Sequence, residues 1–211
     1  MVESVDRSVG RVMQKLDELD LLKKTIIIFT SDNGGLSTLQ RNLRSGPASC
    51  LPLRAGKGWL YEGGIRVPTI ISWPGRIIPG SVSDIPITTC DVYPTLLKVA
   101  GLKSKTKQHL DGLDLSPIFK GSKLQDRPLF WHFPHYHGSG NRPSSSIRKG
   151  SYKLIRWYED GSEELYDLSK DDSEKNDLSE ENPEKRVELS DELSTWLKSS
   201  GAKIPVLNKD N

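Results

Sequence analysis

Cysteine is scarce in this sequence: Cys50 and Cys90 are the only two among 211 residues. Two cysteines are too few for a disulfide framework, and their separation does not match the short ligand spacing of a zinc finger. The cysteine content therefore excludes a small disulfide-stapled domain. It leaves the redox compartment undecided.

The sequence also lacks an excess of one charge and a long apolar run. Thirty basic and 28 acidic residues give a formal net charge of +2, and the two signs are interleaved along the chain. Nucleic-acid binding needs a basic stripe, so we expect no nucleic-acid partner. No apolar run approaches the roughly 20 residues of a membrane span, and the first residues lack a signal-peptide layout. Oligomeric state and location are not specified by these features.

The sequence does contain the periodicities of an α/β protein. Apolar residues recur at steps of three and four from Val2 to Leu19, which predicts an amphipathic helix over 1–20. Because no capping residue precedes Val2, we expect this helix to continue from an upstream part of a larger protein. The β-branched run Thr25–Thr30 predicts a strand buried on both faces, as in a parallel sheet, and Val67–Trp73 predicts a second buried strand.

The second half of the sequence has the pattern of a small antiparallel unit. Tyr152–Tyr158 and Glu164–Leu168 flank an Asp-Gly turn, which predicts a hairpin. Asn182 followed by proline predicts the start of a helix. We therefore expect two domains, a larger α/β unit over 1–125 and a small sheet-and-helix unit over 126–211. In the first domain, 91–100 is predicted to be a short helix and 34–64 a long irregular loop.

Asp32 and Asn33 follow the first predicted strand directly, in the string SDNGG. These residue types are common in turns, which is the simplest interpretation. In an open α/β sheet, however, ligands bind beyond the carboxyl ends of the strands. A carboxylate and an amide carbonyl are hard oxygen ligands that suit Ca²⁺ or Mg²⁺. Lys57, between Gly56 and Gly58, offers an ammonium group for an anionic oxygen near such a metal.

The strings TIIIFTSDNGG and LPLRAGKGWLYEGGIRVPTIISWPG resemble the C-terminal half of the type I sulfatases, the arylsulfatase-like members of the alkaline phosphatase superfamily. The resemblance continues in order through TTCDVYPTLLKVAG, DGLDLSPIF, RPLFWHFP and SIRKGSYKLIRWYEDGSEELYDLSKDDSEKNDL, so it covers nearly the whole chain. It implies the C-terminal part of an alkaline-phosphatase-like α/β sandwich, followed by the small antiparallel subdomain.

The resemblance also implies an activity, the hydrolysis of sulfate monoesters of sugars or aryl alcohols. Asp32 and Asn33 match the second pair of calcium ligands, and Lys57 matches the lysine that holds the sulfate ester oxygens. Glu62 and Arg66 match positions that support the loop carrying this lysine. The family's formylglycine nucleophile and first metal-binding Asp pair belong to an N-terminal half that these residues do not include. Full-length members are usually exported, periplasmic, extracellular or lysosomal.

Two other groups of residues need interpretation. Cys50-Leu51-Pro52-Leu53-Arg54 fits the bare C-x-P-x-R pattern that is read for formylglycine formation. Leu53 stands where the family has a small residue, and the position precedes the lysine motif, so an ordinary loop thiol is favoured for Cys50. His132, His135 and His137 lie close together without Cys or carboxylate partners, which favours a loop over a zinc site. We expect His135 and His137 to stand at the rim of a sulfated-sugar pocket.

Two alternatives to a sulfatase stay open at the level of sequence. The chain could be a catalytically silent module that recognises carbohydrate, or its parent could hydrolyse phosphate or phosphonate monoesters. The complete lysine motif around Lys57 favours sulfate over phosphate. The sequence does not specify which sulfated substrate is used.

Overall fold

The computed structural model describes residues 1–37, 48–104 and 111–206. The predicted loop over 34–64 therefore lies partly outside the described residues. The α-helices are α1 (Val2–Glu18), α2 (Glu62–Ile65), α3 (Val92–Val99) and α4 (Pro183–Ser199). The strands are β1 (Ile27–Thr30), β2 (Thr69–Ser72), β3 (Leu129–Phe133), β4 (Ser144–Lys149), β5 (Tyr152–Trp157) and β6 (Glu163–Asp167). Short 3-10 helices cover Leu22–Lys24, Thr89–Asp91 and Ile118–Lys120.

The chain divides into two compact units. Unit 1 comprises Met1–Thr30 and Pro68–Gln125, and unit 2 comprises Ser31–Val67 and Asp126–Asn211. The sequence-based division at residue 126 into whole domains stays a prediction. None of the described helices is both long enough and apolar enough to cross a membrane.

Unit 1 holds α1, α3 and the strand pair β1–β2. The predicted helices at 1–20 and 91–100 are confirmed. The predicted parallel pairing of the first strand is wrong, because β1 and β2 are antiparallel, with Ile27 opposite Ser72. The predicted burial of both strands is also wrong, since Phe29 is 42% and Ile70 61% exposed. A continuous apolar run indicates what a strand's faces prefer to contact, and it carries no information on the direction of its neighbour.

Unit 2 is built on a sheet of order β3-β4-β5-β6, four antiparallel strands within the described residues. The predicted hairpin is confirmed as β5–β6, with Tyr152 opposite Asp167. The loop predicted for the three neighbouring histidines is wrong at its start, because His132 belongs to β3. Strands β3 and β4 were not predicted from the sequence. Strand β4 begins with the serine run Ser144–Ser146, which lacks the alternation of apolar and polar residues typical of a strand.

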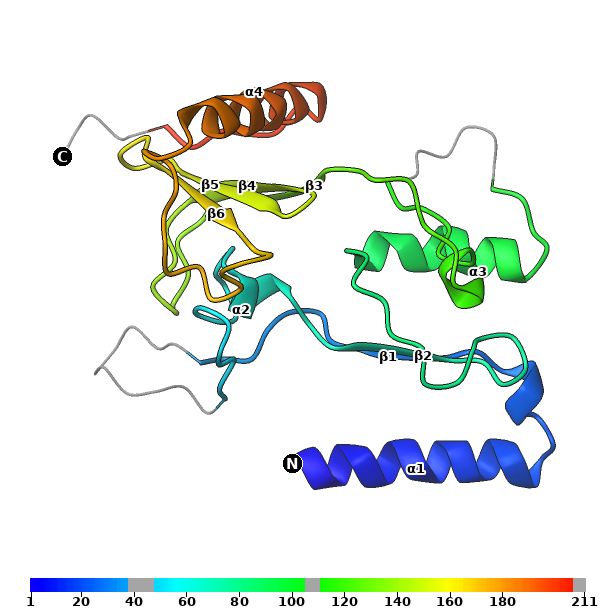
Figure 1. The fold of residues 1–211 in the computed structure, drawn as a ribbon. Coiled ribbons are helices and arrows are strands. Elements are labelled where there is room, and N and C mark those ends of the chain that lie inside the picture. The colour runs from blue at the N-terminus through cyan, green and yellow to red at the C-terminus, as the bar shows by residue number, and fades with distance from the viewer. Residues whose placement is uncertain (38–47, 105–110, 207–211) are drawn as a thin grey trace. The chain divides into compact units, whose positions relative to one another are not determined.

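The two faces of this sheet have different partners, as Figure 1 shows for α4 and α2. Side chains alternate between the faces of a strand. One face packs against α4. The predicted start of this helix is confirmed, because the Asn182 side chain accepts from the Lys185 N–H. Its core consists of Ile147, Leu154, Leu165, Leu189, Leu193 and Leu197. The opposite face carries Ile155 and Trp157, which pack with Tyr61 and Tyr166.

Candidate active site

Two segments that are distant in the sequence lie side by side in unit 2. The Gly34 N–H donates to the Gly64 carbonyl at 3.0 Å, and the Lys57 N–H donates to the Gly35 carbonyl at 2.9 Å. The segment with Asp32 and Asn33 is therefore joined by backbone hydrogen bonds to the segment with Lys57. The sequence motifs thus belong to one local structure.

Glycine is required where these segments meet. A Cβ atom on Gly34 would lie 1.7 Å from the Gly63 carbonyl oxygen, and one on Gly64 would lie 2.0 Å from the Trp59 carbonyl oxygen. Both contacts are with backbone atoms, which cannot move aside as the end of a flexible side chain can. The close approach of the two backbones explains why the motif contains paired glycines.

The polar side chains at this junction have no partners within the described residues. The structure records neither a hydrogen bond nor an ion pair there for the Asp32 carboxylate, the Asn33 amide or the Lys57 ammonium. The backbone of Asn33 is held, since the Ser31 hydroxyl donates to its carbonyl at 2.8 Å. Asp32 and Lys57 are exposed and Asn33 is half-buried. Among the described residues, no side chain or backbone group therefore occupies their charged and polar atoms.

The Asp32 and Asn33 oxygens fit a hard divalent cation as part of its shell. Ca²⁺ takes roughly 6 to 8 oxygen ligands, so two side chains leave most of the shell to other groups. Within the residues that the structure describes, no group of three or more His, Cys, Asp or Glu side chains could hold a metal ion. The metal-ligand roles of Asp32 and Asn33, and the choice of Ca²⁺ over Mg²⁺, stay predictions.

The three neighbouring histidines have different surroundings. His137 lies against the lysine motif, because a Cβ on Gly58 would be 2.2 Å from its Nδ1. Its Nδ1 also pairs with the Ser139 hydroxyl at 2.8 Å. His135 is exposed and its ring meets the Phe133 ring edge-on at a centroid distance of 5.6 Å. His132 is in β3, and its Nδ1 lies 2.7 Å from the Ser145 hydroxyl.

We call residues 54–66, which carry Lys57, the lysine loop. The contacts bring His137, but not His132, to this loop. The substrate-binding roles assigned to His135 and His137 stay predictions. Cys50 is also nearby: its Sγ donates to the Gly35 carbonyl at 3.5 Å, the same oxygen that accepts the Lys57 N–H. An ordinary thiol in this loop accounts for the contact.

Aromatic and ionic groups fix the base of the lysine loop on the sheet. The Tyr61 hydroxyl donates to Glu164 Oε2 at 2.7 Å, and the Tyr166 hydroxyl donates to the same oxygen at 2.9 Å. Burial, with the hydrogen bond to Glu164, raises the pKa of the Tyr61 hydroxyl far above its ordinary value. Arg54 lies 3.8 Å above the Tyr61 ring centroid. Tyr61 is therefore a neutral donor that anchors the loop.

Sequence reasoning missed two buried residues beneath the loop, Lys153 and Glu174. Their side chains are fully buried, and the Lys153 Nζ lies 2.8 Å from Glu174 Oε1. A signal for Lys153 was present, because it shares the period-2 face of Ile155 and Trp157, which are apolar. Glu174 follows β6 in an irregular segment, and nothing in its sequence context indicates burial.

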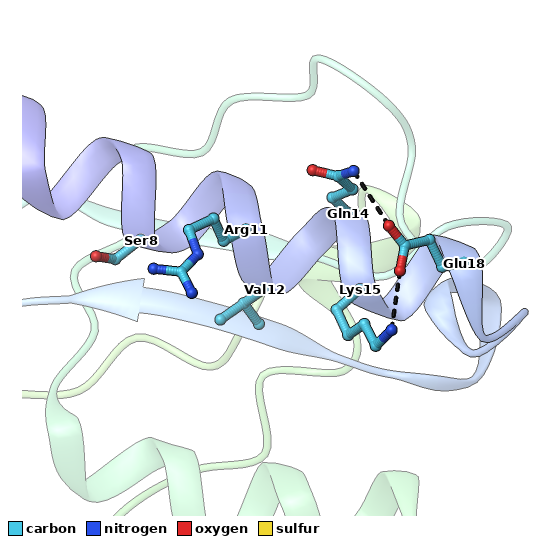
Figure 2. A pocket seen from close by; sticks show the side chains of 6 residues that line it. All are labelled: Ser8, Arg11, Val12, Gln14, Lys15 and Glu18. Atoms are coloured by element: carbon cyan, nitrogen blue, oxygen red, sulfur yellow. Dashed lines mark hydrogen bonds and ion pairs between the residues drawn. The ribbon is translucent and has the colours of Figure 1, made fainter.

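A separate surface depression lies on α1 in unit 1. It is lined by side chains of one helix: Ser8, Arg11, Val12, Gln14, Lys15 and Glu18. The Glu18 carboxylate accepts from Gln14 at 3.1 Å and from Lys15 at 2.9 Å, and Figure 2 marks both contacts with dashed lines. These contacts between residues three and four apart are typical of an exposed helix surface. They assign no chemistry to the depression.

Comparisons with known proteins agree with the motifs. Residues 55–202 match the family model described as N-sulphoglucosamine sulphohydrolase, C-terminal, and residues 1–102 match the model described as Sulfatase. A protein of Formosa agariphila named Sulfatase is 37% identical over 99% of this chain and 41% of its own length. The chain thus spans about two fifths of that relative.

Solved structures give the same result. The structure titled Ps i-CgsB in complex with k-i-k-neocarrahexaose has a TM-score of 0.80 and 32% identity, over 93% of this chain and 41% of its own. The structure of BT4656 in complex with its substrate D-glucosamine-2-N,6-O-disulfate has a TM-score of 0.75 and 26% identity. The match covers 93% of this chain and 39% of the BT4656 chain. The family models, the relatives and the alkaline-phosphatase-like fold of these neighbours together show that this chain belongs to the sulfatase family, whose C-terminal region it matches.

Proposed function

We propose that the protein containing this chain hydrolyses sulfate monoesters, with Lys57 holding the ester's sulfate oxygens and Asp32 and Asn33 contributing to a calcium site. One observation carries the assignment to these residues. The backbone hydrogen bonds from Gly34 to Gly64 and from Lys57 to Gly35 bring onto adjoining segments three polar side chains that have no partner among the described residues. A cation and two hard oxygen ligands side by side suit an anionic ester bound next to a metal.

The role proposed for Lys57 is electrostatic. As the S–O bond breaks, its electron pair moves onto the departing oxygen, and an ammonium beside the sulfate group stabilises the negative charge that develops there. The Lys57 N–H donates to the Gly35 carbonyl, so the backbone of Lys57 is already in place before the reaction. A bound Ca²⁺ supplies Lewis-acid neutralisation of the ester's charge. The formylglycine nucleophile implied by the family resemblance lies outside these 211 residues.

We propose a sulfated carbohydrate as the substrate class, with an aryl sulfate as the simplest synthetic substitute. His137 beside Gly58, and the exposed His135 two residues away, offer hydrogen-bonding groups near Lys57. A structural neighbour that binds a disulfated glucosamine supports this choice. Mg²⁺ is the alternative metal, since it also prefers oxygen ligands.

The test compares two esters with the same leaving group. The complete natural protein, purified with Ca²⁺, is assayed on 4-nitrophenyl sulfate and 4-nitrophenyl phosphate. We expect a higher kcat/KM on the sulfate ester, with release of one sulfate per nitrophenol. A preference for the phosphate ester would contradict the proposal, and binding of sulfated sugars without turnover of either ester would favour a silent recognition module.

A matched pair of lysine variants connects the activity to the site. Lys57→Ala is compared with Lys170→Ala, which removes the same charge from an exposed position in unit 2. We expect the first substitution to abolish most sulfate release and the second to leave it unchanged. Equal effects of the two substitutions would mean that Lys57 acts only through the overall charge.

A further inference from the structure

A fully buried ammonium group lies beneath the lysine loop. The Lys153 Nζ is 3.0 Å from Glu62 Oε1 and 2.8 Å from Glu174 Oε1, and the three side chains are 0–1% exposed. Removing three ionic groups from water is costly, and well-packed apolar residues often serve stability equally well. Stability alone therefore gives no reason for this arrangement. The contacts of these three side chains with the lysine loop give a reason.

Each member of this charge cluster (Glu62, Lys153 and Glu174) comes from a different segment. Lys153 is in β5, where the sheet register places it opposite Arg148 and Tyr166. Glu62 begins α2, five residues after Lys57. Glu174 lies beyond β6 and has a φ of 53°, a left-handed conformation that is uncommon outside glycine. The cluster thus joins the sheet to the loop.

Glu174 holds both ends of the segment Arg54–Glu62. At one end, its Oε2 accepts from the Glu62 N–H at 2.6 Å. At the other end, its backbone carbonyl accepts from Arg54 Nη1 at 2.8 Å. The segment also closes on itself, because the Gly63 N–H donates to the Arg54 carbonyl at 2.9 Å. Lys57 lies between these two points of attachment.

Lys153 is the close counter-charge for both glutamates within the described residues. The guanidinium groups of Arg148 and Arg66 lie 3.7 and 3.9 Å from Glu62 Oε2, and both are partly exposed. Burial raises the pKa of the Glu174 carboxyl, and the ammonium of Lys153 opposes that shift. Without Lys153, the two buried carboxylates would lack their close counter-charge, so either one of them binds a proton or the segment that carries Glu62 moves toward water.

We propose that Lys153 is a positioning residue that, through Glu62 and Glu174, fixes the segment carrying Lys57 on the sheet. Lys153 itself does not touch substrate. The effect of Lys153 on catalysis rests on the proposed function. The effect of Lys153 on the order of the segment Arg54–Glu62 is independent of that function. A displacement of about 1 Å at a catalytic group lowers kcat by about 10²-fold, so loosening this attachment affects the rate more than substrate binding.

The test uses the complete natural protein and the variants Lys153→Met and Lys149→Met. Lys149 is the matched control, because it pairs with Glu188 at 3.3 Å and Glu192 at 2.8 Å on the α4 face of the same sheet. Amide hydrogen exchange is measured at 62–64 in the loop and at the β4–β5 pair Ile147 and Leu154. We expect Lys153→Met to speed exchange in the loop by at least about tenfold while the strands stay protected, and Lys149→Met to leave the loop unchanged.

Steady-state kinetics on 4-nitrophenyl sulfate supply the second readout. We expect Lys153→Met to lower kcat by about 10²-fold with little change in KM and none in calcium content. Unchanged exchange at 62–64 would overturn the positioning role, whatever the activity. Faster loop exchange in a protein whose wild type hydrolyses no sulfate ester would support the positioning role and contradict the proposed function instead.

Lys153→Met can also weaken the fold as a whole. Glu174→Gln decides that case, because it keeps the side-chain volume and an oxygen that can accept from the Glu62 N–H. Faster exchange confined to the loop in Glu174→Gln supports the proposal. Equal increases in loop and strands in both variants would show that the cluster stabilises the whole unit, and the proposal would be wrong.

Discussion

At the scale of single residues, Asp160 shows how a short turn controls ionisation. It lies between β5 and β6, where its Oδ1 accepts from the Ser162 hydroxyl at 2.6 Å and from the Ser162 N–H at 3.0 Å. These hydrogen bonds, with a further one from Arg142, lower the pKa of the Asp160 carboxyl to about 2. The ionised form of Asp160 is therefore favoured by the folded turn.

We expect Ser162→Ala to raise the pKa of Asp160 toward its ordinary value of 3.8. Because the folded-state pKa is below the unfolded one, this turn stabilises the protein above the unfolded pKa, and the contribution is lost as the pH falls through about 2. The Ser162→Ala variant should thus lose more stability at pH 6 than at pH 2. An NMR titration of the Asp160 carboxyl measures the shift directly.

Ser169→Ala is the control for this prediction. Ser169 donates its hydroxyl and N–H to Asp167 in an equivalent turn, so its loss should leave Asp160 unchanged. An Asp160 that titrates identically with and without the Ser162 hydroxyl would show that Arg142 or the solvent sets its pKa.

The residues that matter chemically differ in how visible they are in the sequence. Asp32, Asn33 and Lys57 are predicted from glycine-rich strings that are distinctive and local in the sequence, and their roles stay predictions. Lys153 was overlooked because a lysine in a strand is normally interpreted as solvent-facing, although it shares a strand face with the apolar Ile155 and Trp157. Its pairing with distant glutamates, which makes its burial possible, has no local sequence signal. The contact of His137 with Gly58 depends on a loop that folds back over many residues, which no local pattern specifies.

At the scale of elements, α4 contributes the apolar layer on one face of the sheet. Leu193 is fully buried in the core formed with Ile147, Leu154 and Leu165. We expect Leu193→Ala to lower the free energy of unfolding by about 2–5 kcal/mol, through lost burial and the cavity left behind. Urea denaturation of the variant measures this loss.

Val187 provides the control on the same helix, since it is 52% exposed. We expect Val187→Ala to change the free energy of unfolding by no more than about 0.5 kcal/mol. Similar losses for the two variants would mean that α4 does not pack on the sheet through Leu193.

The lysine loop depends on backbone contacts that exclude a side chain. We expect Gly64→Ala to disrupt the loop, because its Cβ would lie 2.0 Å from the Trp59 carbonyl and 2.6 Å from the Gly56 carbonyl. Gly138→Ala is the matched control in unit 2, with no atom within 4 Å of its Cβ. Faster proteolysis within 54–66 for the first variant alone is the expected result; equal resistance would contradict the tight packing.

Element type could be predicted wherever one periodicity dominated. The stripe of α1, the capped start of α4 and the Asp-Gly turn of β5–β6 are local signals, and the structure confirms all three. The direction of β1–β2 pairing and the presence of β4 could not be predicted. Both depend on which segment comes to lie alongside, and the serines of β4 are buried through tertiary contacts rather than their own hydrophobicity.

At the scale of the whole molecule, the 211-residue chain supplies part of the proposed chemistry. We expect this chain alone to bind Ca²⁺ weakly, because Asp32 and Asn33 cannot satisfy an ion that takes roughly 6 to 8 oxygens. We also expect no hydrolysis of 4-nitrophenyl sulfate above background. Calorimetry checks the first statement, and micromolar Ca²⁺ binding would contradict it. A sulfate-release assay on the metal-loaded chain checks the second, and turnover that Cys50→Ala abolishes would contradict it.

The division of work between metal and lysine is the central claim, and Asp32→Ala and Lys57→Ala in the complete natural protein test it most directly. Calcium content and turnover of 4-nitrophenyl sulfate are measured together, at low and at high Ca²⁺. We predict that Asp32→Ala loses calcium and regains part of its activity at high Ca²⁺. Lys57→Ala should keep its calcium, lose about 10²–10³-fold in kcat, and not recover. A Lys57→Ala protein with near-wild-type turnover and bound calcium would contradict the account.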